Sequence, residues 1–237
     1  MRGRRVAAII VAAGGGERLG AEEPKAFVPT AGRRMVCWSI AAMRACERIT
    51  AIVVVVPAGR ADWATAALGR DADHVQVVEG GATRAVSVAR GVAAAPSNAA
   101  FMLVHDAARP LVSAALVKRV LNGVEGGDGA IAAHPVADSL KTVAGDGRIG
   151  RSVSRAGLWA AETPQVFRAD PFREAIARAL AEGTLDEMTD CASIMEAAGR
   201  TVRLVGAGEP NLKVTTAGDL AVVEALLAAR AEGAPVH

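Results

Sequence analysis

Short apolar runs that end in glycine or charged residues constrain the fold of this chain more than any other feature. Four such runs lie in its first half, at 6–13, 51–56, 74–78 and 101–104. Runs of this length and composition are typical of strands that are buried on both faces of a parallel sheet. Between them, apolar residues recur at helical spacing, as at 35–47 and 83–94. The alternation predicts an α/β fold, a Rossmann-like and mostly parallel twisted sheet with helices on both faces.

The second half continues this pattern and closes it with a capped helix. Further helices are expected at 60–68, 114–124, 170–182 and 190–198, and further strands at 130–136, 201–205 and 212–215. Asp170 and Pro171 suit the start of the third of these helices. Thr216 and Asp219 form a capping box for a helix at the carboxyl end. The sequence shows no internal repeat and no obvious linker, so we expect a single domain over 1–237.

One segment departs from the alternation. From about 137 to 155 the sequence is more polar, and two β-like pieces at 140–143 and 149–153 are joined by AGDGR. This pattern predicts a β-hairpin. Because it interrupts an α/β repeat, we expect an arm that projects from the domain and serves a partner subunit or reaches over a site; a plain surface hairpin is the alternative.

Composition limits the classes of partner. The net charge is only +2, aromatic residues make up 3% and tyrosine is absent, so neither a broad polyanion-binding field nor a stacking surface for nucleic acid is expected. The chain lacks the run of about 18 apolar residues that a membrane span needs. Its three cysteines have no metal-ligand spacing and indicate reduced thiols in a cytoplasmic protein. Arg2, Arg4 and Arg5 before the first apolar run imitate a secretion signal, but we interpret that run as the first strand.

Three of the predicted strands are followed by loops whose glycine and charged residues could bind a ligand. These loops read GGGER, GGATR and HDAARP, and they follow the first, third and fourth strands. Because the carboxyl ends of parallel strands share one edge, the loops are expected to meet there. Gly14, Gly15 and Gly16 can adopt positive φ and bring N–H groups against an anion, while Arg18 and Lys25 supply full charges. The first loop therefore suggests a phosphate-handling loop, with an ordinary turn and two surface cations as the alternative.

The better-known phosphate motifs do not match this loop. A P-loop needs Gly-Lys-Ser/Thr, whereas Gly20 is followed by Ala21 and Glu22. The dinucleotide fingerprint fails at Leu19, where it needs a third glycine, and the next strand ends in 57–59, Pro-Ala-Gly, without a carboxylate for a ribose. A NAD-dependent dehydrogenase is therefore a weaker interpretation than a nucleotidyltransferase.

Taken in order, several motifs resemble one known family. They are AAGGGERLGAEEPK, GGATRAVSV, LVHDAARP, DSLK, SRAGLW, ETPQVF, TDCAS and NLKVTT, and together they cover nearly the whole chain. This set is similar to that of the 2-C-methyl-D-erythritol 4-phosphate cytidylyltransferases. The resemblance implies transfer of CMP from CTP to a polyol phosphate with release of pyrophosphate. It also implies Mg²⁺ held mainly by the CTP phosphates, with Asp106 as a further candidate ligand, and a cytoplasmic homodimer formed through the arm.

The resemblance also implies roles for individual residues. Arg18 and Lys25 match the catalytic pair. The CTP-binding positions are Ala13, Gly14, Gly15, Gly16, Arg18, Lys25, Gly80, Gly81, Arg84, Ser87, Asp106 and Lys213. The polyol phosphate positions are Asp106, Arg109, Ser139, Arg155, Thr163, Thr189 and Lys213, with Ser139 and Arg155 on or beside the arm. We assign no catalytic role to His105.

The chain departs from the family pattern at a few positions. Val11 replaces the usual proline, Ser139 the usual threonine, and Cys191 a common acidic residue, while Ala82 leaves any base contact at that point to the backbone. Two alternative functions stay open. One is a cytidylyltransferase for another polyol phosphate, such as ribitol 5-phosphate, and the other is a non-catalytic nucleotide-binding protein on the same fold.

Overall fold

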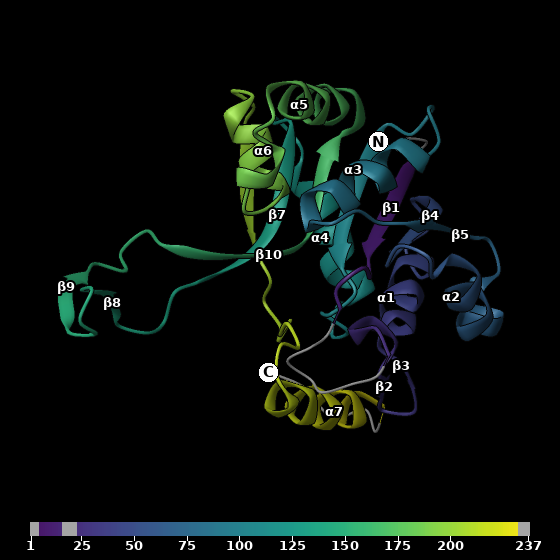
Figure 1. The fold of residues 1–237 in the computed structure, drawn as a ribbon, viewed down its shortest axis with the longest axis horizontal. Coiled ribbons are helices and arrows are strands. Elements are labelled where there is room, and N and C mark those ends of the chain that lie inside the picture. Colours follow the sequence, from purple (N-terminus) through teal and green to yellow (C-terminus); the bar gives the residue numbers. More distant parts are fainter. Residues whose placement is uncertain (1–4, 16–22, 232–237) are drawn as a thin grey trace.

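A seven-stranded sheet forms the centre of the computed structural model, which describes residues 5–15 and 23–231 (Figure 1). Its strands are β1 (Val6–Val11), β4 (Ile49–Val56), β5 (Val75–Glu79), β6 (Phe101–Asp106), β7 (Gly129–Pro135), β10 (Trp159–Arg168) and β11 (Val202–Gly206). They lie in the order β11-β7-β10-β6-β1-β4-β5. Strand β10 runs antiparallel to both of its neighbours, and the other paired strands are parallel. The predicted α/β class and mostly parallel sheet are confirmed.

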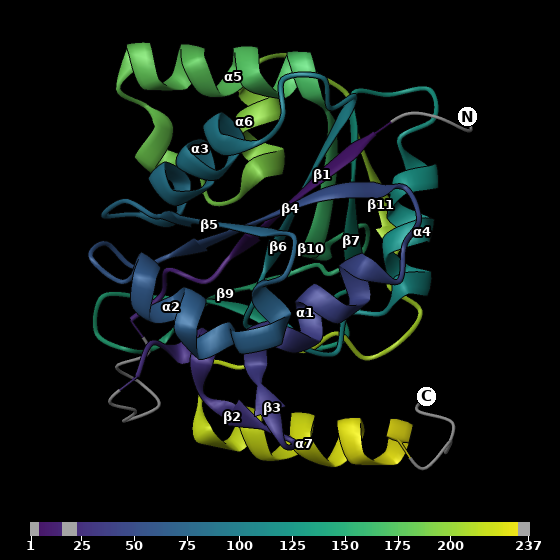
Figure 2. The same cartoon turned by 90° about the vertical axis from the view of Figure 1, so that its right-hand side faces the viewer.

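Helices cover both faces of the sheet, as Figure 2 shows. On one face lie α1 (Met35–Arg44), α2 (Ala61–Leu68) and α4 (Ala114–Gly123); on the other lie α3 (Arg84–Ala94), α5 (Ala169–Glu182) and α6 (Cys191–Ala197). Strand β1 shows why its sequence is apolar throughout. Val6, Ala8 and Ile10 point into the first cluster, and Ala7 and Ile9 into the second, all fully buried.

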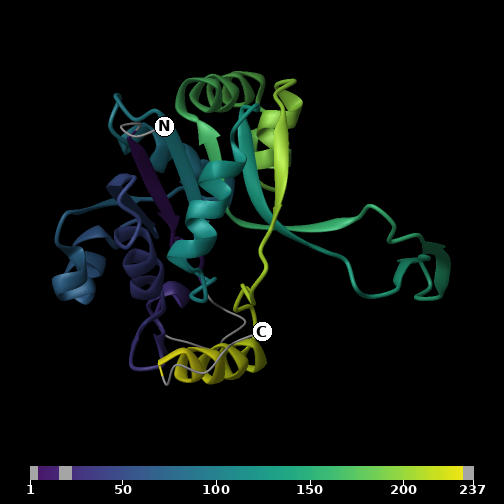
Figure 3. The same cartoon turned by 180° about the vertical axis from the view of Figure 1, so that it is seen from behind.

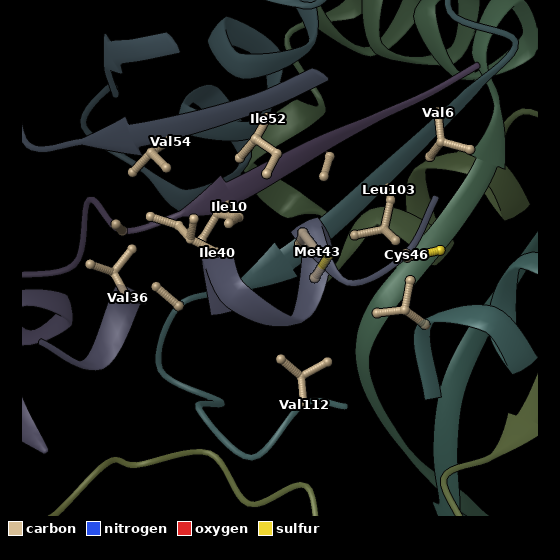
Figure 4. Close-up of a cluster of buried hydrophobic side chains, with 14 of the residues drawn as sticks. Val6, Ile10, Val36, Ile40, Met43, Cys46, Ile52, Val54, Leu103 and Val112 are labelled. Carbon is tan, nitrogen blue, oxygen red and sulfur yellow. The ribbon is translucent and has the colours of Figure 1, made fainter. Parts of the chain in front are cut away.

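The first cluster packs α1 tightly onto the sheet. Ile40 and Met43 of α1 lie against Ile10 of β1 and Leu103 of β6 (Figure 4). These side chains are fully buried, so the strands that lead into the glycine and HDAARP loops rest on a closely packed support.

A smaller cluster holds the last helix. Helix α7 (Ala217–Ala231) lies near the short strands β2 (Pro29–Thr30) and β3 (Arg33–Arg34). Its Val223 and Leu227 form this cluster together with Met35, Leu111 and Val214. The predicted capping box is present, since Asp219 N donates to Thr216 Oγ1 and Thr216 N donates to Asp219 Oδ2. The helix thereby fixes the segment around Lys213 beside the sheet.

The predicted hairpin projects from the molecule. Strands β8 (Leu140–Val143) and β9 (Ile149–Val153) form a separate two-stranded sheet, and Figures 1 and 3 show it reaching far from the body. Pro135 pairs with Trp159 at its base. Val143 and Ile149 are 76% and 69% exposed, which leaves apolar side chains on the arm in water.

Two local predictions are wrong. No strand forms at 212–215, where Val214 N makes a single backbone hydrogen bond to Ala108 O and its side chain enters the cluster under α7. Helix α5 begins at Ala169 with Arg168 as its N-cap, so Asp170 lies in the first turn.

The three cysteines are buried and unpaired. Within residues 5–15 and 23–231, no helix is long and apolar enough to cross a membrane.

Candidate functional site

A hollow of about 310 Å³ lies where the predicted loops come together. Its lining comes from the first glycine loop, the short helix η2 (Lys25–Phe27), the GGATR loop, the end of β6 and the segment before α7. The candidate residues among them are Ala13, Gly14, Gly15, Lys25, Gly81, Arg84, Ser87, Asp106 and Lys213. The loops do meet at one edge of the sheet. Gly16 and Arg18 lie outside the described residues.

The two pairs of glycines differ in how closely they pack against other residues. The expected positive φ is not found at Gly14 or Gly15, and a Cβ added to either would meet nothing within 4 Å. At Gly80 a Cβ would lie 2.6 Å from Ser87 Oγ, and at Gly81 it would lie 2.2 Å from Val86 Cγ1. The GGATR loop therefore needs glycine because it packs closely against α3, and Gly80 lies behind the lining residues.

Asp106 binds two cations that sequence reasoning did not pair with it. Arg84 Nε lies 2.9 Å from Asp106 Oδ1, and Lys213 Nζ lies 2.7 Å from Asp106 Oδ2. Burial alone would raise the pKa of Asp106, but the charges of Arg84 and Lys213 outweigh it and hold that pKa well below its usual range. The carboxylate therefore keeps two cations in the lining of the hollow.

A second hollow of about 260 Å³ adjoins the first and shares Arg84, Asp106 and Lys213 with it. Its other lining residues are Arg109, Ala161, Glu162, Thr163, Gln165, Thr189 and Asp190. Arg109, Thr163 and Thr189 are thus brought together as a group. Two anionic ligands placed in the two hollows would meet at the shared charged residues.

Arg109 is held by a buried network behind the second hollow. Its Nη1 donates to Asn211 O at 2.7 Å, and Asn211 Nδ2 donates to Glu162 Oε2 at 2.7 Å. Glu162 Oε1 accepts from His134 Nδ1 at 2.6 Å and lies 3.9 Å from Arg109 Nη1. Burial lowers the pKa of Arg109, against the opposing charge of Glu162. Arg109 Nε is buried without an acceptor among the described residues.

Sequence reasoning missed Glu162, Gln165 and Asp190 as lining residues. The first two lie in the ETPQVF motif and the third in TDCAS, so the motifs located the segments but not these side chains. Gln165 Nε2 donates to Asp190 Oδ2 at 2.7 Å, and Gln165 Oε1 accepts from Cys191 N at 3.1 Å. Gln165 thereby ties β10 to the start of α6.

His105 lines neither hollow. It is fully buried, with Nε2 3.2 Å from Arg109 O and Nδ1 3.0 Å from Thr163 Oγ1. Burial lowers the pKa of His105 to about 4, so the ring is neutral near pH 7. The Thr163 hydroxyl also accepts from Asp106 N at 3.0 Å, so it braces the strand that carries Asp106.

Ser139 and Arg155 lie apart from both hollows. Each is exposed and flanks the β8–β9 hairpin, and neither lines a hollow of the same chain. The arm points away from the body (Figure 1), so the structure does not bring these two residues to either hollow of their own chain.

The donor set of the site suits a magnesium ion that a substrate brings with it. No cluster of three or more His, Cys, Asp or Glu residues that could hold a metal occurs in the part of the chain that the structure describes. Asp106 supplies the hard oxygen ligand that Mg²⁺ prefers, and it faces both hollows. The residues therefore fit an ion coordinated mainly by phosphate oxygens, with Asp106 as a protein ligand.

Comparisons with known proteins agree on one family. The family model described as 2-C-methyl-D-erythritol 4-phosphate cytidylyltransferase matches residues 6–229. A protein of that name from Prochlorococcus marinus (strain MIT 9313) is 43% identical over 224 residues, which cover 94% of this chain and 98% of that protein.

Solved structures give the same result. The crystal structure of the enzyme of that name from Thermus thermophilus is similar with a TM-score of 0.77 and 36% identity, covering 94% of this chain and 98% of the other. The 4-diphosphocytidyl-2C-methyl-D-erythritol synthase structure from Anaerococcus prevotii has a TM-score of 0.81 at 24% identity over 95% of this chain and 99% of the other, which shows the shared fold.

Proposed function

This chain belongs to the 2-C-methyl-D-erythritol 4-phosphate cytidylyltransferase family, and from that membership we propose that the first hollow binds CTP and the second the polyol phosphate. The observation that carries the proposal is the pair of adjoining hollows with Arg84, Asp106 and Lys213 in common. A reaction between two anionic substrates needs cations where they meet. Arg84 and Lys213 lie there, and Lys25 lines the CTP side.

In the proposed reaction a phosphate oxygen of the polyol phosphate attacks the α-phosphorus of CTP. A new P–O bond forms, the bond from the α-phosphorus to its bridging oxygen breaks, and pyrophosphate leaves with that electron pair. Lys25 and the N–H groups of Gly14 and Gly15 would stabilise the negative charge that grows on the triphosphate. Arg18, which lies outside the described residues, is proposed as the partner of Lys25.

On the polyol side, Arg109 and Thr189, which both line the second hollow, would bind the phosphate and contact the substrate. Thr163 is placed to hold Asp106 and His105 more than to contact a ligand, because its hydroxyl already has both as partners. A bound Mg²⁺ would neutralise phosphate charge next to Asp106. Arg84 and Lys213, which Asp106 now holds, would orient the incoming phosphates.

A homodimer that completes each site with the partner's arm is part of this proposal. Its support is the position of Ser139 and Arg155 on an exposed arm that carries Val143 and Ile149 to its tip. A dimer would cover these apolar side chains. We also propose a cytoplasmic location, supported by three buried, unpaired thiols, and a single domain over 1–237.

The test is to incubate the purified protein with CTP, Mg²⁺ and each of two acceptors, 2-C-methyl-D-erythritol 4-phosphate and ribitol 5-phosphate. We expect pyrophosphate release and a CDP-polyol product with the first acceptor and little with the second. Preference for ribitol 5-phosphate would overturn the assigned acceptor. Binding of CTP without release of pyrophosphate under either condition would favour the non-catalytic alternative.

A further inference from the structure

We propose that Arg90 is a positioning residue that makes the CTP hollow selective for cytosine over uracil. Arg90 lies on α3, one helical turn after Ser87. Its side chain is exposed and does not line the hollow, but its Nη1 donates to Gly80 O at 2.7 Å. The inference rests on the proposed binding of CTP there.

Both ends of one peptide unit are held from α3. The carbonyl of Gly80 and the N–H of Gly81 belong to the same planar group and point in opposite directions. Arg90 Nη1 donates to the carbonyl end, and Ser87 Oγ accepts from the N–H end at 3.1 Å. A peptide between two glycines rotates easily, so these two bonds determine which way it faces.

The orientation of that peptide decides what Ser87 offers a base. Ser87 Oγ donates its single proton to Thr83 O at 2.8 Å and accepts the Gly81 N–H. One acceptor position is left on the hydroxyl of Ser87, a residue that lines the hollow. In the CTP complex that we propose, the base lies beside Ser87. Cytosine presents an amino donor where uracil presents a carbonyl acceptor, so an acceptor at Ser87 favours cytosine.

Loss of Arg90 would release this arrangement. Without a donor at its carbonyl, the peptide between Gly80 and Gly81 can rotate and withdraw its N–H from Ser87. Without the Gly81 N–H to orient its lone pair, the Ser87 hydroxyl can turn its proton away from Thr83 O and donate it to a uracil carbonyl. Selectivity should fall while the triphosphate and polyol contacts, which lie elsewhere in the two hollows, stay unchanged.

The test compares kcat/KM for CTP and UTP in Arg90→Met and Arg90→Lys with the wild type. One hydrogen bond supports an expected fall of the CTP-to-UTP ratio by about three- to tenfold in Arg90→Met. Arg90→Lys keeps a donor and should recover much of the ratio. The KM for the polyol phosphate should not change. Calorimetric binding of CTP and UTP to the same variants gives selectivity independently of turnover.

Arg173→Met is the matched control, because Arg173 likewise donates from a helix to backbone carbonyls, those of Pro96 and Ser97 at 2.9 and 3.4 Å, away from the hollow. Its ratio should equal that of the wild type. An Arg90→Met ratio within twofold of the wild type, or an equal loss for both nucleotides, would overturn the inference. A wild type that binds neither nucleotide would instead refute the proposed function.

Discussion

At the residue scale, the Asp106 carboxylate holds Arg84 and Lys213 in the region that the two hollows share. Like charges that converge in a partly buried place repel one another unless an opposite charge lies between them. In the proposed reaction this same convergence is useful, because it keeps two cations ready for phosphate groups. The stability of the fold and the readiness of the site therefore depend on one acidic group.

Asp106→Asn should lower the free energy of unfolding by about 2 kcal/mol at pH 7, because both cations lose a charged partner. The pKa of Asp106 is lower in the folded than in the unfolded chain, so its contribution is fully present above about pH 5 and is lost as the pH falls through 4 and below. Urea titrations of both proteins at pH 7 and pH 3 measure this. The difference in the free energy of unfolding between the wild type and Asp106→Asn should be smaller at pH 3 than at pH 7. An equal difference at both pH values would contradict the ion-pair account.

Lys25→Met should reduce kcat by about 10²- to 10³-fold, since a cation that lines the CTP hollow is removed from the place where negative charge develops. Steady-state rates of pyrophosphate release would show the change. The control is Lys118→Met, at an exposed position of α4, for which we expect wild-type rates. Near-normal turnover in Lys25→Met would rule out its proposed role.

At the scale of elements, α3 is the helix that joins the sheet to the first hollow, the proposed CTP site. It carries Arg84 and Ser87 at its start, and Gly91 allows it to approach β1 and β4. A Cβ at Gly91 would lie 2.5 Å from Ile9 Cγ2 and 2.8 Å from Val55 Cγ2. The close approach places the start of α3 at the edge of the sheet.

Gly91→Ala should therefore destabilise the protein by about 1–2 kcal/mol, since the clash outweighs the better helix propensity of alanine. The KM for CTP should rise as well, because α3 must move away from the sheet. Thermal unfolding and steady-state kinetics would measure the two effects. Gly206→Ala is the control, because a Cβ there meets nothing within 4 Å. If both variants behave alike, close packing is not the reason for Gly91.

The sequence predicted well those elements whose own residues carry the signal. Strands β1, β4 and β6 are apolar on both faces, so their runs identified them. Strand β10 was missed because buried Glu162, Thr163 and Gln165 give it the polarity of a loop. Those groups are satisfied by distant partners, such as Asn211 and the backbone N–H groups of Asp106 and Cys191, which local pattern does not reveal.

The same limit applies to the site. The glycine loops, Lys25 and Lys213 could be named from their motifs, and the structure brings the described ones to one hollow. The pairing of Asp106 with Arg84, 22 positions away, and with Lys213, 107 positions away, depends on the order of the strands and on α7. Residues 212–215 show the opposite error. Their β-like character reflects burial of Val214 under α7 and no ladder of hydrogen bonds.

At the scale of the whole molecule, the proposed dimer makes each active site from the body of one chain and the arm of the other. Arg155→Ala and Lys25→Met would then damage different halves of a site. Mixing the two inactive proteins under conditions of subunit exchange should restore about a quarter of the wild-type activity, since half of the dimers are mixed and each has one intact site.

The measurement is the enzymatic activity of the mixture. Sedimentation of the mixture confirms that the subunits have exchanged. Mixing each variant with itself is the control and should give no recovery. If exchanged mixtures stay inactive while Arg155→Ala alone is impaired, the arm acts within its own chain. If Arg155→Ala alone is fully active, the arm does not take part in the reaction.

The position of β10 in the sheet has a consequence for how the chain folds. Strands β5, β4, β1 and β6 are adjacent and all come from residues 6–106, so they can assemble as soon as that part has been synthesised. Strands β7 and β11 reach β6 only through β10, which ends at Arg168. The nascent protein must therefore keep one edge of β6 open while the arm is still being made. Apart from Lys213, the lining of the first hollow can form before the second hollow has its wall of β10.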